Sequence, residues 1–255
     1  MSAVHLILDG DIAELRLDNP AKLNALTVEM LGQLAAHCDA IERSPDIRCV
    51  LLTATGSRAF CAGADINAWG DLSPADFVRT WVRDGHRIFD RLARLCKPTI
   101  AVLSGPAFGG GLELAAACDI RVMVPSATLA LPETAVGIVP GWSGTQRLLR
   151  LLPEAVVKEM LLFGRKLSAD RALALGFVAE VSDDPRSVAL TIVERLTHTS
   201  PRAAEVAKYM IHAGAGEDTP ALIEALASGM IAASADKTEG VAAFRAKRKP
   251  EFPGT

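Results

Sequence analysis

Two glutamates, Glu113 and Glu133, are the residues of this sequence best suited to acid–base chemistry. Glu113 comes shortly after three consecutive glycines at residues 109–111, at the start of an apolar helix, and Glu133 directly follows Pro132. A carboxylate at such a turn can face a pocket lined by backbone amides. Two carboxylates that reach one pocket can accept and donate protons in the same reaction. For either glutamate alone, a first-turn acid favoured by the helix dipole by about 0.3–1 kcal/mol is an equally simple interpretation.

Two turns of small residues could bring backbone amides to these acids. They are Phe60–Asn67 and Ser104–Gly111, and each follows a predicted strand. One outward-facing amide from each turn would form an oxyanion hole, which binds a carbonyl oxygen more tightly once it gains negative charge. Such turns also serve strand-to-helix packing or phosphate binding, but the glycines are followed by neither Lys-Ser nor Lys-Thr, and Leu114 replaces the last glycine of a dinucleotide motif.

The sequence does not favour a serine hydrolase. Residues 141–145 resemble the nucleophile motif of these enzymes but lack its second glycine. No histidine lies near a candidate serine along the chain, and His37 and His86 are interpreted as solvent-exposed or core-edge residues of predicted helices. Paired carboxylates are therefore the better candidates for catalysis.

Composition limits the kind of protein that holds this site. The 255 residues are half apolar with a net charge of −3, which predicts one catalytic body with a small appendage and no broad positive field for nucleic acid, although residues 247–249 are basic. The five cysteines are irregularly spaced, so neither a disulfide framework nor a metal site is expected. No apolar run approaches the roughly 18 residues of a membrane span, and a cytoplasmic protein is predicted.

Strands and helices alternate in the first part of the chain. Val4–Leu8 and Ile12–Leu17 predict a hairpin around Asp9-Gly10, and Thr27–Arg43 predicts a helix with Thr27 as its N-cap. Further strands are predicted at Cys49–Thr53, Thr99–Leu103 and Ile120–Val124, and further helices at Pro74–Leu95 and Gly111–Cys118. This order predicts parallel strands joined by crossover helices.

After about residue 185 the sequence predicts helices alone. They are expected at Val188–Leu196, Ala203–Met210, Leu222–Met230 and Thr238–Ala246. Such an Ala- and Met-rich tail packs either against a partner subunit or on its own core.

Five blocks then make the chain recognisable: Asp18–Leu26, Phe60–Ile66, Gly105–Asp119, Pro132–Leu148 and Phe244–Phe252. In this order they resemble blocks of the enoyl-CoA hydratase/isomerase, or crotonase, family. The resemblance implies an α/β fold, with a crotonase-like spiral of β-β-α units over residues 1–185 and a helical C-terminal trimerisation region over residues 186–255. It also implies a homotrimer or a dimer of trimers, an acyl-CoA thioester substrate, and no cofactor other than the coenzyme A that the substrate carries.

The same resemblance assigns roles to the candidate residues. Ala64 and Gly110 resemble the two oxyanion-hole residues, and Glu113 and Glu133 match both acids of the hydratases. The implied function is an enoyl-CoA hydratase, which reversibly adds water across the 2,3 double bond of a 2-enoyl-CoA to give a 3-hydroxyacyl-CoA. Resemblance favours Glu133 as the proton donor to the α-carbon and Glu113 as the base that orients water. From the residues alone, the titration of the two acids belongs to the pair.

Further residues are expected to bind the substrate. Lys22 is a candidate cation for the phosphates of CoA, and Phe244 and Lys247, three residues apart on one predicted helix face, resemble the family's tail contribution from a neighbouring subunit. Asn67 stands where relatives frequently have lysine. The full set of expected substrate-binding residues is Lys22, Leu23, Ala62, Asp65, Ile66, Asn67, Trp142, Phe244 and Lys247.

Trp142 departs from the family pattern, because relatives mostly carry alanine or glycine at this position. Its indole could narrow the acyl pocket or pack beneath it. The predicted helix Pro74–Leu95, with Trp69 just before it and Trp81 within it, corresponds to the variable wall that shapes acyl selectivity in the family.

Three alternatives stay open at this point. A double-bond isomerase needs one acid that shuttles a proton, so a pair of acids favours a hydratase. A specialised acyl-CoA dehydratase of the same family would share the site. Some crotonase relatives bind RNA or act as scaffolds, but this acidic chain has only 5% aromatic residues and no basic stripe.

Overall fold

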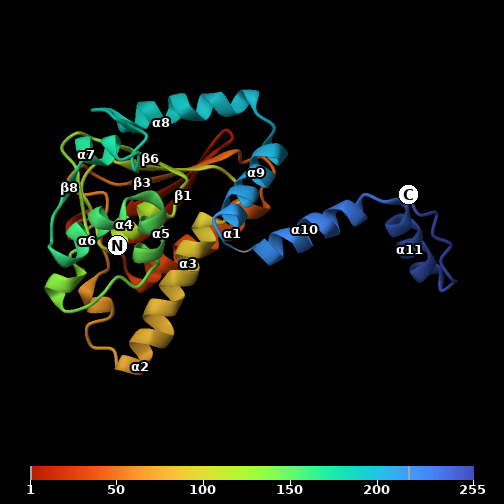
Figure 1. Ribbon diagram of the computed structural model, residues 1–255, viewed down its shortest axis with the longest axis horizontal. Coiled ribbons are helices and arrows are strands. Elements are labelled where there is room, and N and C mark those ends of the chain that lie inside the picture. The colour runs from red at the N-terminus through yellow and green to blue at the C-terminus, as the bar shows by residue number, and fades with distance from the viewer. Residues whose placement is uncertain (1, 218) are drawn as a thin grey trace. The chain divides into compact units, whose positions relative to one another are not determined.

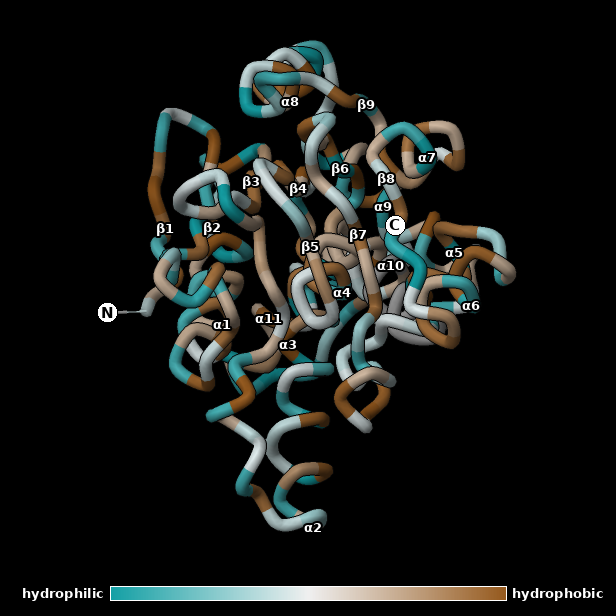
Figure 2. Tube along the Cα trace, turned by 90° about the vertical axis from the view of Figure 1, so that its left-hand side faces the viewer, coloured by the Kyte–Doolittle hydropathy of each residue, from teal (hydrophilic) through white to brown (hydrophobic). Residues whose placement is uncertain are grey.

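A six-stranded sheet forms the centre of the fold. The structure is a computed structural model that describes residues 2–217 and 219–255. The strand order is β1-β2-β3-β4-β6-β9, and Figure 2 shows the first five of these strands side by side in this order. The bounds are β1 Ala3–Asp9, β2 Ile12–Asp18, β3 Cys49–Ala54, β4 Thr99–Leu103, β6 Ile120–Met123 and β9 Glu180–Val181.

The first two strands form the predicted hairpin, and every later pairing in the sheet is parallel. Asp9 pairs with Ile12 across the turn, where Gly10 has a φ of +58°, a left-handed conformation that glycine adopts without steric cost. From β2 to β9 the strands pair in parallel, as the alternation of strands and helices predicts.

Helices cover both faces of this sheet. Helix α1 (Val28–Arg43) begins at Thr27, whose side chain accepts a 3.2 Å hydrogen bond from the amide of Met30, so the predicted N-cap is confirmed. Figure 1 shows α8 (Pro185–Glu194) along one face, with α1 and α3 (Arg83–Ala93) on the other. The strand residues under α8 alternate with those that face α1 and α3; they are Cys49, Leu51, Ile100, Val102 and Val122.

The predicted helix Pro74–Leu95 is interrupted. It consists of a first turn, α2 (Pro74–Asp76), a π-helical segment, η3 (Phe77–Val82), and α3, which ends at Ala93. π-Helical segments insert extra residues into a helix and often occur at functional sites. In this protein the segment carries aromatic side chains into the cavity described below.

Short elements link the sheet to the site. A second sheet has the order β5-β7-β8, formed by Ala107–Phe108, Thr128–Ala130 and Leu167–Ser168. Strands of two or three residues are too short to show an alternating pattern, so the sequence did not predict them. The remaining elements up to the tail are η1 Pro20–Lys22, η2 Ile66–Ala68, α4 Gly110–Ala116, η4 Glu133–Val136, α5 Gly144–Leu151, α6 Glu154–Leu162 and α7 Ala169–Ala174.

The tail is helical, as predicted. After α8 it comprises η5 Arg195–His198, α9 Pro201–Gly214, α10 Thr219–Ala232 and α11 Ala235–Ala246. The chain divides into two compact units, one ending at Ala204 and one spanning Glu205–Thr255, so α8 belongs with the sheet. The boundary at residue 185 and the oligomerisation role of residues 186–255 stay predictions. Among the described residues, no helix combines the length and apolarity needed to cross a bilayer.

Candidate active site

Two glycine turns meet at the start of α4. Gly63 has a φ of +110° and Gly109 a φ of +49°, conformations that side chains rarely adopt. A Cβ atom on Gly63 would lie 3.5 Å from the amide nitrogen of Gly110, and one on Gly110 would lie 3.5 Å from the amide nitrogen of Ala64. The amides of Ala64 and Gly110 therefore come from distant loops but lie close together.

Both amides are available to a ligand. Leu26 holds the first turn from both sides, because its amide donates to the carbonyl of Gly63 and its carbonyl accepts from Asp65, each at 2.8 Å. Among the described residues, the amides of Ala64 and Gly110 donate to no protein acceptor. Two neighbouring amides without a protein acceptor are the kind of donors that an oxyanion hole requires.

Glu113 is buried beside these amides. Its Oε1 atom accepts hydrogen bonds from the backbone amides of Trp142 and Gly144, both at 2.8 Å. A Cβ atom at position 144 would lie 2.7 Å from the same oxygen, so glycine is required there. Burial raises the pKa of Glu113 from its ordinary 4.5 to about 7; the Trp142 amide opposes this shift and the charge of Glu133 adds to it.

Glu133 lies on the other side of the second turn. Its Oε1 atom would be 2.9 Å from a Cβ on Gly109, so the carboxylate packs directly against the glycine that precedes the oxyanion amide. Its Oε2 atom is buried and has no hydrogen-bond partner among the described residues. Burial raises the pKa of Glu133, which favours the neutral acid. The expected helix start at this residue is a single 3₁₀ turn, Glu133–Val136.

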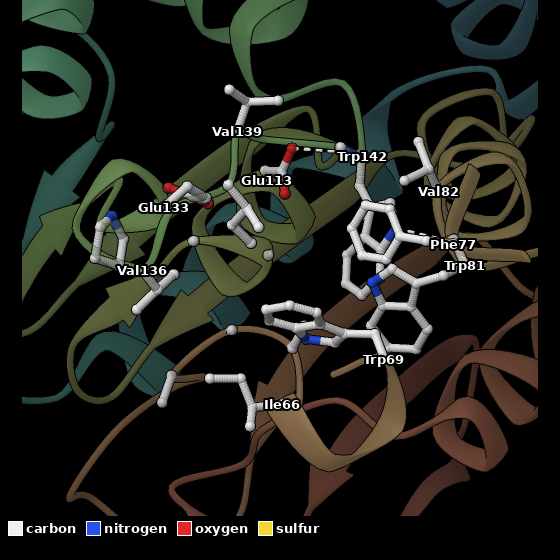
Figure 3. Close-up of a pocket in the computed structure, with 18 residues that line it drawn as sticks. Ile66, Trp69, Phe77, Trp81, Val82, Glu113, Glu133, Val136, Val139 and Trp142 are labelled. Carbon is white, nitrogen blue, oxygen red and sulfur yellow. Dashed lines mark hydrogen bonds between the residues drawn. The ribbon is translucent and has the colours of Figure 1, made fainter. Parts of the chain in front are cut away.

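One cavity of about 170 Å³ contains all four groups. Figure 3 shows Glu113 and Glu133 near one another on one side, and the rings of Trp69, Trp81 and Trp142 on the facing side and below. The structure thus brings together the two acids and the two oxyanion residues predicted from the sequence. The remaining lining residues are Ala62, Gly63, Ile66, Phe77, Val82, Gly109, Pro132, Val136, Ile138, Val139 and Gly141.

The other predicted binding residues divide into three groups. Ala62, Ile66 and Trp142 line the cavity. Lys22, Leu23, Asp65 and Asn67 lie beside it and hold its loops: Lys22 Nζ is 2.6 Å from Asp65 Oδ2, Asn67 donates its amide to Asp65 Oδ1, and the carbonyl of Leu23 accepts from Ala62. The positive charge of Lys22 is therefore already paired with a carboxylate.

Phe244 and Lys247 lie in the second compact unit. Phe244 is 86% exposed on α11, but that helix ends at Ala246, and Lys247 adopts a left-handed conformation with a φ of 53°. The expectation that both residues share one helix face is therefore wrong. The chain turns there because the amides of Lys247 and Arg248 close the last helical turn on carbonyls of α11. Their contact with CoA stays a prediction.

Sequence reasoning missed a histidine–serine contact behind the site. Ser143 Oγ and His86 Nδ1 are 2.6 Å apart, and Nε2 of the same histidine is 3.6 Å from Asp90, which forms an ion pair with Arg147. Ser143 has a left-handed φ of 74° and lies between the two amides that hold Glu113. Both residues lie outside the cavity lining, so the contact supports the turn rather than a nucleophile. The helical spacing of His86 and Asp90 was the available sequence signal.

Comparisons with known proteins identify the family of this chain. The family model described as enoyl-CoA hydratase/isomerase matches residues 8–255. A short-chain-enoyl-CoA hydratase of Clostridium acetobutylicum is 32% identical, over 98% of this chain and 97% of the relative. An (E)-benzylidenesuccinyl-CoA hydratase of Thauera aromatica is 33% identical, over 98% and 99%. The crystal structure of an enoyl-CoA hydratase from Bacillus anthracis has a TM-score of 0.80 at 32% identity, with 99% of each chain covered. With its free amide pair and buried acids, this chain belongs to the enoyl-CoA hydratase/isomerase family and has the crotonase fold.

Proposed function

We propose that the protein is a 2-enoyl-CoA hydratase that adds water reversibly across the 2,3 double bond of an acyl-CoA thioester. The observation that carries this proposal is the convergence of two buried carboxylates and two free amides on one cavity. Water adds to this double bond because conjugation with the thioester makes the β-carbon electrophilic. The reaction needs a group that stabilises an enolate, a base for water and an acid for the α-carbon.

The amides of Ala64 and Gly110 would receive the thioester oxygen. As water attacks, the electron pair of the double bond moves toward the thioester, and its oxygen gains negative charge. Two fixed donors bind this oxygen more strongly in the enolate than in the substrate, which lowers the barrier. Each donor of this kind is worth about 10² to 10³ in rate.

The environments of the acids support different roles. Burial raises the pKa of both acids, to about 7 for Glu113, so near neutral pH part of Glu113 is ionised and its charge is stabilised by two donated amides. Oε2 of Glu133 has no partner among the described residues that would stabilise a charge, which favours its neutral acid. Glu113 then accepts a proton from water as the water oxygen bonds to the β-carbon. Glu133 gives its proton to the α-carbon as the enolate collapses. The net change is the addition of one water, and proton exchange with solvent resets the pair.

The names of the relatives support hydration as the reaction, but they do not agree on the acyl group. The two named hydratases are 32% and 33% identical to this chain, yet one is named for short-chain and the other for benzylidenesuccinyl thioesters. The thioester, the amide pair and the acids are common to both reactions. We extend the proposal to a homotrimer or dimer of trimers that uses no cofactor beyond the CoA of its substrate.

Incubation with crotonyl-CoA tests the proposal. We expect the absorbance of the conjugated thioester to fall as 3-hydroxybutyryl-CoA forms, and the same equilibrium to be reached from the product. A non-conjugated 3-enoyl-CoA serves as the control for isomerase activity, because an isomerase would increase that absorbance. An isomerase that leaves crotonyl-CoA unchanged would replace the proposed hydratase.

A further inference from the structure

The indole of Trp142 forms a fixed wall of the cavity. The side chain is 3% exposed, and its Nε1 donates a 3.1 Å hydrogen bond to the carbonyl of Trp81 in the π-helical segment. Its ring centroid lies 4.9 Å from that of Trp81 and 5.1 Å from that of Phe89. A ring held by one hydrogen bond and two aromatic contacts has little freedom to move aside for a ligand.

Glycines on two different helices make room for this ring. A Cβ atom on Gly85 of α3 would lie 2.1 Å from Nε1, and one on Gly110 of α4 would lie 2.8 Å from Cζ3. The indole therefore extends from the α3 wall to the glycine that provides an oxyanion amide. It therefore occupies the part of the cavity next to the predicted carbonyl site.

The space that remains is small. The cavity measures about 170 Å³ and has to accept the reacting thioester as well as the acyl tail. For comparison, a cavity of about 150 Å³ is filled by one benzene molecule. The wall opposite the acids is apolar, with Phe77, Val82 and three tryptophans, so it suits a hydrocarbon tail without charge.

We propose that Trp142 sets the acyl-length limit of the site and restricts the enzyme to short 2-enoyl thioesters of crotonyl size. This inference rests on the proposed function and adds the substrate class to it. Longer tails and aryl tails are rejected because the indole cannot leave its position between Gly85 and Gly110. The same residue donates its amide to Glu113, so the wall that limits the substrate and the support of one acid are a single structural unit.

The test compares crotonyl-, octenoyl- and cinnamoyl-CoA in the wild type and in Trp142→Ala. The wild type is expected to prefer crotonyl-CoA in kcat/KM by more than about tenfold, the range that methylene discrimination reaches in apolar pockets. Trp142→Ala keeps the backbone amide and is expected to shift the octenoyl-to-crotonyl ratio by about 10- to 200-fold toward octenoyl-CoA. Phe177→Ala is the matched control, because Phe177 is fully buried but lies outside the cavity lining.

The ratio, rather than the rate, decides the outcome. A wild type that hydrates octenoyl- or cinnamoyl-CoA as efficiently as crotonyl-CoA overturns the inference, and so does a ratio that Trp142→Ala leaves unchanged. If Phe177→Ala shifts the octenoyl-to-crotonyl ratio equally, the cause is a general loosening of the core and not the removal of the Trp142 indole. Trp142→Phe, which keeps most of the packing, should give a smaller shift in the same direction if the alanine variant does not fold.

Binding without chemistry separates this inference from the hydratase proposal. Saturated butyryl- and octanoyl-CoA cannot be hydrated, so calorimetric titration with each measures the pocket alone. Tighter binding of butyryl-CoA, reversed in Trp142→Ala, supports the wall even if no hydration is seen. Tighter binding of octanoyl-CoA than of butyryl-CoA by the wild type overturns the inference that Trp142 limits acyl length, even if crotonyl-CoA is hydrated.

Discussion

One side of the cavity consists of glycine turns and two buried carboxylates, and the facing side consists of aromatic rings carried largely by the π-helical segment η3 and its neighbours. On the first side, the conformation of the backbone matters most, because Gly109 and Gly144 leave the space that the carboxylates of Glu133 and Glu113 occupy. On the second side, the volume of the aromatic side chains determines how much space is left for a substrate. In the proposed function, reaction type and substrate choice therefore depend on different parts of the molecule, which meet at Trp142.

Removing either acid should have the largest effect. Glu113→Gln and Glu133→Gln each keep the shape of the side chain but cannot exchange the proton that the proposed reaction requires. We expect kcat for crotonyl-CoA to fall by about 10² to 10⁴, while butyryl-CoA still binds. Turnover close to that of the wild type in either variant would remove that acid from the mechanism.

A methyl group at Gly109 should disturb the acid side almost as strongly. A Cβ there would lie 2.9 Å from Glu133 Oε1 and would require an unfavourable positive φ. We expect Gly109→Ala to lower kcat/KM by about 10² to 10³, the effect of losing one oxyanion donor. Gly164→Ala is the matched control, since Gly164 has a φ of +66° with no atom within 4 Å of its Cβ position. Equal activity loss in both variants would point to strain rather than to the site.

The raised pKa of Glu113 predicts a stability change that is independent of activity. Between pH 4.5 and about 7 the folded protein keeps a proton that the unfolded chain has released, so stability falls as pH rises through this range. Relative to Glu113→Gln, the wild type should lose up to about 3 kcal/mol of unfolding free energy from pH 4.5 to above 7. Urea unfolding of both proteins measures this, with the exposed Glu29→Gln as control. If the unfolding free energies of the wild type and Glu113→Gln change with pH in the same way, the raised pKa of Glu113 is contradicted.

The aromatic side can be tested by a double-mutant cycle. Gly85→Ala should destabilise the wild type by about 1–3 kcal/mol, because the new methyl group overlaps the indole of Trp142. In a Trp142→Ala background the same change should cost nothing or stabilise, since alanine favours a helix interior over glycine by about 0.5–1 kcal/mol. Additive effects in thermal unfolding would mean that the two residues are not in contact.

Ser143 should give the smallest effect. Ser143→Ala loses the hydrogen bond with His86 but keeps the left-handed backbone, and we expect a loss of about 1 kcal/mol in unfolding free energy. Ser143→Gly also loses the hydrogen bond but tolerates the left-handed φ, so it should be more stable than the alanine variant. Because the turn holds Glu113, the acidic limb of the pH–rate profile should shift in both variants. If the pH–rate profile shifts in neither variant, the contact between Ser143 and His86 supports only the structure of the turn.

The sequence predicted the features that depend on neighbouring residues. The hairpin at Asp9-Gly10, the Thr27 cap and the turn before Glu113 are local, and the resemblance placed Ala64 and Gly110 together. The sequence did not predict contacts that depend on tertiary packing. His86 and Ser143 are 57 residues apart, and Lys22 is paired with Asp65 across 43 residues, so neither contact has a local pattern. The interruption of the helix at Phe77–Val82 also has no periodic signal that distinguishes it from an ordinary α-helix.

Hydration of crotonyl-CoA in deuterium oxide, followed in the wild type and in both glutamine variants, shows whether a solvent-exchanged proton reaches the α-carbon and whether both acids are needed for its delivery. We expect a 3-hydroxybutyryl-CoA that carries one deuterium on its α-carbon, detected by NMR or mass spectrometry. We also expect Glu113→Gln and Glu133→Gln to form this product far more slowly. Unlabelled product, or labelled product formed at the wild-type rate by both variants, would contradict the proposal that the two carboxylates act together in hydration.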